Sequence, residues 1–172
     1  MLSKLKIVEH LNFITKDDDI ESMLQKALRV CDELALGRLK KLGIYGYEYD
    51  VSLAVAELGL DEELVNELVD DYVAQVIKSV VQFEKYLTQL LSEQKQDLEL
   101  DYTLFRELAH KNLGVARNLR IKNAETLLYE LMKQDDLEYL LSCLEALKYC
   151  AIKLRVECAY KTIKLINLKS SL

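Results

Sequence analysis

The sequence predicts an all-α protein, and three features carry this prediction. The 172 residues include no proline and only five glycines, the residue types that interrupt or weaken helix interiors. Apolar residues recur at the three- and four-residue spacing of amphipathic helices along almost the whole chain. Hydrophobic residues make up 51% and charged residues 30%, a balance typical of globular domains. We therefore expect long helices with short connections around a hydrophobic core.

The first two expected helices form an N-terminal helical hairpin. A short amphipathic segment runs from about Leu2 to Ile14. Asp17 to Asp19 then supply a cap and first-turn carboxylates for a second helix that reaches to about Leu42. Residues 43–50 contain two glycines and three tyrosines and are the best candidate for a joint between parts of the chain. The tyrosines there are expected in a core or an interface.

The rest of the chain is expected to form an antiparallel four-helix bundle, because the connections between its helices are short. A short helix from Val51 stops at Gly59, and Asp61 caps a long helix to about Gln94. The later expected helices are 101–120, 123–134 and one from Asp135 or Asp136 to about Leu168, with a bend allowed. We therefore divide the chain into residues 1–50, the hairpin and joint, and residues 51–172, the bundle.

His110 is the candidate functional residue, because it lies on the water-facing side of its helix. At about 100° per residue, the buried face opposite His110 is expected to contain Phe105, Leu108, Asn112, Val115, Ala116 and Leu119. The ridge around His110 is expected to contain Arg106, Leu113, Gly114, Arg117 and Ile121. Leu113, Gly114 and Ile121 are unusual on a solvated ridge and suit a surface that docks a partner.

Gly114 and the two arginines make this histidine more than an ordinary surface residue. A glycine inside a helix costs about 1 kcal/mol relative to alanine. Gly114 stands one turn beyond His110, where a missing side chain lets another protein approach the imidazole closely. Arg106 and Arg117 flank the histidine and are suited to donate hydrogen bonds to an anion held on the ring.

The stretch 109–119, Ala-His-Lys-Asn-Leu-Gly-Val-Ala-Arg-Asn-Leu, resembles the signature of histidine phosphotransfer (HPt) domains. In that family an apolar residue, a lysine and a glycine stand two, three and four positions after the phospho-accepting histidine. Gly114, Ala116, Asn118 and Leu119 match the pattern. The expected order of helices between about Leu58 and Leu168 is also similar to the family's four-helix bundle.

Two residues depart from the family pattern. Asn112 stands at the apolar position and Leu113 at the position of the lysine that neutralises the phosphoryl group. Lys111 is basic but projects about 100° from His110. Two alternatives follow: Arg117 replaces the missing charge, or the protein keeps the binding surface without efficient phosphotransfer. A buried Asn112 would need hydrogen-bond partners inside the bundle.

The resemblance implies a phosphocarrier rather than a true enzyme, with no cofactor. His110 would accept a phosphoryl group from a histidine kinase or a response-regulator receiver domain and pass it to another receiver. The alternative function is an unphosphorylated HPt-like module that binds and regulates a receiver or kinase. The hairpin of residues 1–42 is a candidate for dimerisation, for completing the bundle or for binding the kinase.

Other partners and sites are disfavoured by charge and spacing. The net charge of −6 argues against nucleic acid or an anionic membrane as the main partner. The chain has no apolar run of membrane-spanning length and no signal-peptide pattern at its start, so we expect a cytoplasmic protein. Glu107 and His110 have the E-x-x-H spacing of di-iron bundles, but that site needs the pair on two helices facing inward, and we expect no metal.

The four cysteines, Cys31, Cys143, Cys150 and Cys158, show no C-x-x-C spacing. The last three recur at intervals of seven and eight residues, which places them on one stripe of the expected final helix. Buried free thiols are the simplest interpretation. A zinc site would need further His or Cys partners.

Overall fold

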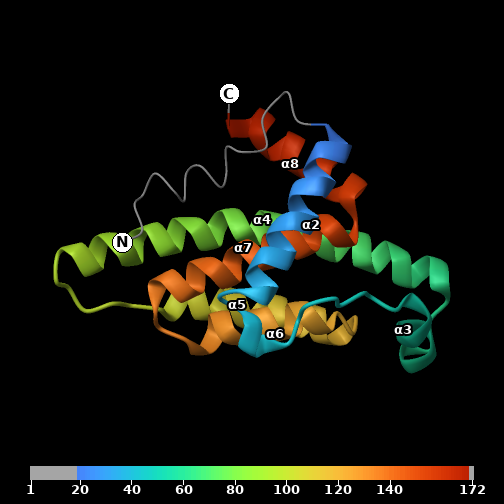
Figure 1. Cartoon of the computed structure of the whole chain (residues 1–172), viewed down its shortest axis with the longest axis horizontal. Coiled ribbons are helices and arrows are strands. Elements are labelled where there is room, and N and C mark those ends of the chain that lie inside the picture. The colour runs from blue at the N-terminus through green and yellow to red at the C-terminus, as the bar shows by residue number, and fades with distance from the viewer. Residues whose placement is uncertain (1–18, 171–172) are drawn as a thin grey trace.

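The computed structural model describes residues 19–170, and its chain is all-helical over that range, as predicted (Figure 1). The described residues contain no strand. The elements are α2 (Ile20–Leu36), a 3-10 helix η1 (Lys40–Leu42), α3 (Val51–Leu58), α4 (Glu62–Lys95), α5 (Thr103–Asn118), α6 (Lys122–Lys133), α7 (Leu137–Leu154) and α8 (Val156–Ser170). The expected helix from Leu2 to Ile14, and with it the N-terminal hairpin, lies outside these residues.

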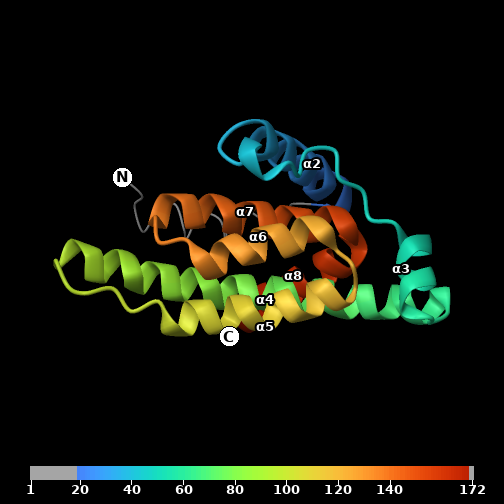
Figure 2. The ribbon, with the colours of Figure 1, turned by 90° about the horizontal axis from the view of Figure 1, so that it is seen from below.

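Helices α4, α5, α6 and α7 lie side by side and enclose most of the core. α4 packs against α5 and α7, and α6 packs against the same two helices. Figure 2 shows α6 and α7 as one layer above α4 and α5. Only residues 119–121 separate α5 from α6 and only residues 134–136 separate α6 from α7, so these neighbours run antiparallel.

Aspartates cap the helices close to where the sequence predicted them. Asp61 accepts a hydrogen bond from the backbone N–H of Leu64 at 2.8 Å, and Asp136 accepts one from Glu138 at 3.0 Å. Asp19 caps α2 in the same way. Each such cap is worth about 1 kcal/mol. The caps determine where these helices begin.

Helix α2 is shorter than predicted, because it ends at Leu36 and not near Leu42. The Gly37 N–H still donates to the carbonyl oxygen of Glu33 at 3.0 Å. A Cβ at Gly37 would lie 2.8 Å from that same oxygen, so the chain leaves the helix at a residue without a side chain. α2 then lies across the outer side of α7 and contacts α8 as well (Figure 1).

The expected final helix is interrupted at Arg155, where the backbone turns to φ −145° and ψ 79°. The Arg155 guanidinium donates to Asn66 at 2.7 Å and lies 3.3 Å from the carboxylate of Asp70, both on α4. These contacts hold the break against α4. Cys143 and Cys150 lie on α7, whereas Cys158 lies on α8, beyond the break. The predicted stripe of three cysteines on one helix is therefore wrong for Cys158.

The core between α4 and α7 contains a buried carboxylate and a buried ammonium group. Glu84 of α4 is 3% exposed and Lys148 of α7 is 5% exposed. Burial raises the pKa of Glu84 to about 7, although Lys148 opposes this rise. Burial likewise lowers the pKa of Lys148 to about 8, against the effect of Glu84. Desolvation of both charges therefore dominates over their attraction.

This burial predicts a specific pH dependence of stability. Between its ordinary value of 4.5 and about 7, folded Glu84 keeps a proton that the unfolded chain loses, so stability should fall as the pH rises through this window. Glu84→Gln removes this effect. As the pH rises from 4.5 to about 7, the free energy of unfolding of Glu84→Gln should therefore increase relative to that of the wild type by up to about 3 kcal/mol. Urea denaturation at several pH values measures the difference, and a constant difference would contradict the prediction.

Candidate functional site

Helix α5 carries the candidate site and is embedded between two neighbours. It packs against α4 on one side and α6 on the other. Its fully buried residues are Phe105, Ala109, Asn112, Leu113 and Ala116. The Phe105 ring meets Phe83 of α4 edge-on, with 5.1 Å between ring centroids. Because α5 contacts two helices, its side chains are buried over a wider part of the helix circumference than a single neighbour would cover.

His110 is exposed to solvent, as predicted from the helical projection. Gly114, one turn further on, is also exposed, and a Cβ built there would meet no atom within 4 Å. The surface beside the imidazole is therefore open. The glycine has no packing role in the described structure that would offset its cost in a helix. The exposure of Gly114 is as predicted, and its role in giving a partner access to His110 stays a prediction.

Two residues assigned to the exposed ridge are buried, and the prediction for both is wrong. Leu113 is 2% exposed and belongs to the main core. The buried arc of α5 extends towards Leu113 because α5 packs against two helices. Ile121 is also 2% exposed. α5 ends at Asn118, and Arg120 then turns the chain with φ +63°, so the helical projection does not apply to Ile121. Neither side chain contributes to an exposed docking surface.

Asn112 is buried at 1% exposure and its amide is fully engaged. Its Nδ2 donates to the Ser79 hydroxyl at 3.1 Å and to the Leu108 carbonyl at 2.9 Å. The Ser79 hydroxyl lies 3.3 Å from the Asn112 Oδ1. The hydrogen bonds that a buried asparagine requires are thus supplied by α4 and by the preceding turn of α5. Asn112 therefore joins α5 to α4 directly beneath the histidine-bearing surface.

The three basic residues near His110 differ in their surroundings. The guanidinium of Arg106 stacks over the Tyr102 ring at 4.6 Å from its centroid, and Arg106 is half-buried. Lys111 is exposed. The side chain of Arg117 is 61% exposed and lies 3.7 Å from the carboxylate of Glu125 on α6. Glu125 is only 18% exposed, but Lys122 lies 3.4 Å from the same carboxylate, so Arg117 can move away without leaving Glu125 unpaired.

Two tyrosines of the joint, which the sequence placed in a core or interface, hold the connection after α5. The Tyr49 hydroxyl donates to the Leu119 carbonyl at 2.8 Å. The Tyr47 hydroxyl accepts from the Lys122 backbone N–H at 3.0 Å and donates to the Arg120 carbonyl at 3.3 Å. Burial raises the pKa of both phenols. The joint therefore stabilises the turn that separates α5 from α6.

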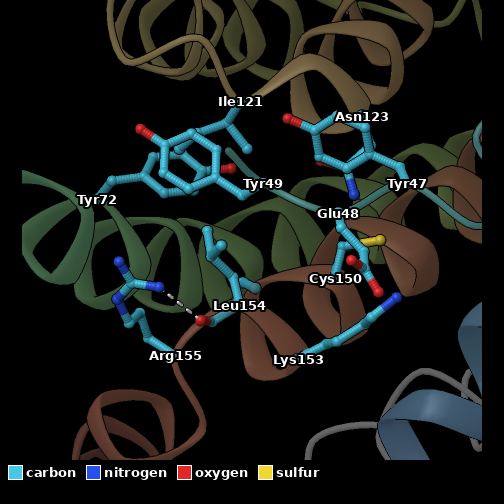
Figure 3. Close-up of a pocket in the computed structure, with 11 residues that line it drawn as sticks. Tyr47, Glu48, Tyr49, Tyr72, Ile121, Asn123, Cys150, Lys153, Leu154 and Arg155 are labelled. Carbon is cyan, nitrogen blue, oxygen red and sulfur yellow. Dashed lines mark hydrogen bonds between the residues drawn. The ribbon is translucent and has the colours of Figure 1, made fainter. Parts of the chain in front are cut away.

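The same tyrosines line a cavity of about 220 Å³ that the sequence did not reveal (Figure 3). Its walls come from the joint, from α4, from the α5–α6 connection with the first turn of α6, and from the end of α7 with Arg155. They include Tyr47, Glu48, Tyr49, Tyr72, Ile121, Asn123, Cys150, Lys153, Leu154 and Arg155. Sequence spacing could not have found this cavity, because its lining comes from four separate segments.

A metal site of three or more His, Cys, Asp or Glu side chains does not occur among residues 19–170. His110 and Glu107 are both exposed there, which is unlike the inward-facing pair of a di-iron bundle. None of the helices in the same range combines the length and apolar character needed to cross a membrane.

Comparisons of the chain with protein-family models, with curated proteins and with solved structures found no match. The function must therefore be inferred from the residues themselves and from their geometry.

Proposed function

We propose that the protein is a histidine-containing phosphocarrier that holds a phosphoryl group on His110 between a kinase or receiver domain and another receiver domain. The observation that carries the proposal is the exposed imidazole of His110 beside the unobstructed surface of Gly114. A phosphocarrier histidine must be reachable by the active site of its partner. A helix face with no side chain at Gly114, one turn further on, meets this requirement.

The arrangement of helices supports the same proposal. We propose that α4, α5, α6 and α7 form an HPt-like four-helix bundle, with His110 on its second helix. Supporting observations are the contacts of α4 and α6 with both α5 and α7 and the short antiparallel connections. Asn112 and Phe105 anchor the inner side of α5 to α4, so the backbone under His110 is rigidly held.

In the proposed chemistry, the imidazole of His110 is the only group of this chain that forms a bond to phosphorus. A ring nitrogen of His110 attacks the phosphorus of a receiver's aspartyl phosphate, the N–P bond forms and the acyl P–O bond breaks. The aspartate carboxylate is the leaving group. The reverse reaction delivers the phosphoryl group to the next receiver. The partner supplies most of the charge stabilisation, because phosphoryl transfer depends mainly on positioning and electrostatics.

Wild-type protein incubated with phosphorylated receiver domains of the same organism tests the proposal. We expect a label that is labile in acid and stable in alkali, as for a phosphoramidate. Mass spectrometry under alkaline conditions should place one phosphoryl group on the peptide that contains His110. Failure of every receiver and kinase donor to label the protein would contradict phosphotransfer.

Arg117 is the residue proposed to replace the lysine of the family pattern. It lies on the same ridge as His110, about 10 Å along the helix axis, and its exposed side chain can extend towards the ring. Arg117→Ala should slow phosphotransfer about tenfold, which corresponds to ~1.4 kcal/mol of lost transition-state stabilisation. Single-turnover transfer from a labelled receiver measures the rate.

Lys122→Ala is the matched control for Arg117→Ala. Lys122 is an exposed cation that lies 3.4 Å from the same carboxylate of Glu125, but it belongs to α6 and not to the His110 ridge. Its loss should leave the transfer rate unchanged. A normal rate in Arg117→Ala together with a slow rate in Lys111→Ala would show that Lys111, and not Arg117, neutralises the phosphoryl group.

The second candidate function is an unphosphorylated interaction module, and the position of Leu113 favours it. Leu113 occupies the place of the family's lysine and is buried in the core, so α5 presents no cation at this position. Under this alternative the protein binds a receiver or kinase but accepts no phosphoryl group. A pull-down with receiver domains that succeeds without any acid-labile label would support it.

A further inference from the structure

A pair of thiols connects α2 to the bundle. The Sγ atoms of Cys31 on α2 and Cys150 on α7 lie 3.7 Å apart, although 119 positions separate the two residues in the chain. Both are free cysteines. The other two cysteines have different surroundings: Cys143 is fully buried, and the Cys158 thiol donates to the carbonyl of Asp70 at 3.2 Å.

The short distance follows from how α2 packs on α7. The buried face of α2 consists of Met23, Ala27, Cys31 and Ala35. Two alanines on this face allow the helix backbones to approach closely, because the distance between packed helices decreases with the size of the side chains at their contact. Met23, Ala27 and Cys31 belong to the main core, and Val30 and Leu34 pack against it. A covalent bond between Cys31 and Cys150 would link α2 to α7 at this contact.

The two thiols are electrostatically unequal. Hydrogen bonding from Cys150 lowers the pKa of Cys31, and the ammonium of Lys153 adds to this effect against the opposing cost of burial. The same hydrogen bond, together with burial, raises the pKa of Cys150 well above its ordinary value. Cys31 is thus the group that more readily becomes a thiolate, the nucleophilic form of cysteine. Cys150 is placed to react second.

A cavity gives a small oxidant a route to Cys150, and Cys31 lies directly behind it. Cys150 lines the 220 Å³ cavity, together with Lys153 from the next turn of α7 (Figure 3). Cys31 itself is 9% exposed. A hydroperoxide that enters this cavity beside Cys150 comes close to the Cys31 sulfur as well, because the two Sγ atoms are only 3.7 Å apart.

We propose that Cys31 and Cys150 are a site of reversible oxidation, at which a hydroperoxide produces a disulfide between α2 and α7. The Cys31 thiolate attacks the peroxide, an S–O bond forms, the O–O bond breaks and the leaving oxygen takes a proton to become water or an alcohol. The Cys150 sulfur then attacks the Cys31 sulfenic acid, the S–S bond forms, the S–O bond breaks and water leaves. Two thiols are oxidised by two electrons and one hydroperoxide is reduced. This proposal is independent of phosphotransfer.

Hydrogen peroxide treatment of the full chain, followed by peptide mapping without reductant, tests the proposal. We expect a cross-linked peptide pair containing Cys31 and Cys150, with a mass lower by two hydrogen atoms, that dithiothreitol separates. A disulfide closing so long a loop should raise the melting temperature by roughly 5–15 °C. Reduction should reverse this shift.

Cys31→Ser and Cys150→Ser should each abolish the cross-link and the shift in melting temperature, while Cys143→Ser and Cys158→Ser should retain both. Mapping of the wild type remains decisive even where a variant folds poorly. Recovery of both thiols unmodified, their conversion to sulfinic acids, or a disulfide that includes Cys158 would each overturn the proposal.

Discussion

His110→Gln is expected to abolish acid-labile phosphorylation completely, while the protein still binds its receiver. Glutamine has a similar length and polarity but no ring nitrogen that can form a phosphoramidate. The exposed position of His110 means that the substitution should not disturb packing, since surface substitutions usually change stability by about 0.5 kcal/mol or less. Labelling with a phosphorylated receiver measures the first effect, and a pull-down measures the second.

The chain provides a clean control for this experiment, because it contains only two histidines, His10 and His110. His10→Gln should leave labelling at the wild-type level. Alkaline treatment distinguishes the label from an aspartyl phosphate, because alkali hydrolyses an acyl phosphate while phosphohistidine survives. Full acid-labile labelling of His110→Gln would refute the proposed function. Loss of labelling in His10→Gln would also refute it, because the phosphoryl group would then be carried by His10.

Phe105→Ala is expected to cost about 3–5 kcal/mol of unfolding free energy. The Phe105 side chain is 1% exposed and meets Phe83 in an edge-to-face contact, which is itself worth about 1 kcal/mol beyond the area buried. The substitution leaves a cavity between α5 and α4 directly below the surface that carries His110. Because whole domains are stable by only about 5–15 kcal/mol, the variant should lose a large share of its stability.

Leu104→Ala is the matched control for Phe105→Ala. Leu104 precedes Phe105 on the same helix but is 56% exposed, so its loss creates no cavity and should change stability by about 0.5 kcal/mol or less. Urea denaturation of both variants measures the comparison. A loss below about 1 kcal/mol in Phe105→Ala, or equal losses in the two variants, would show that α5 is not held by this contact.

Local sequence features were sufficient to predict the helices and part of the candidate site. The absence of proline and the helical spacing of apolar residues predicted an all-α chain. Asp61 caps α4 as predicted, and Asp136, one of the two predicted start positions, caps α7. The exposure of His110 and Gly114 and the burial of Asn112 were also predictable. These properties depend on neighbours within one or two helical turns, which the sequence lists directly.

Properties that depend on more than one neighbouring element were decided by the tertiary structure. Leu113 is buried because α5 packs against two helices at once, and a projection of one helix cannot count its neighbours. The break at Arg155 depends on Asn66 and Asp70 of α4. The 3.7 Å approach of Cys31 to Cys150 depends on where α2 crosses α7. Such contacts join residues tens of positions apart, and only the packing of whole helices brings them together.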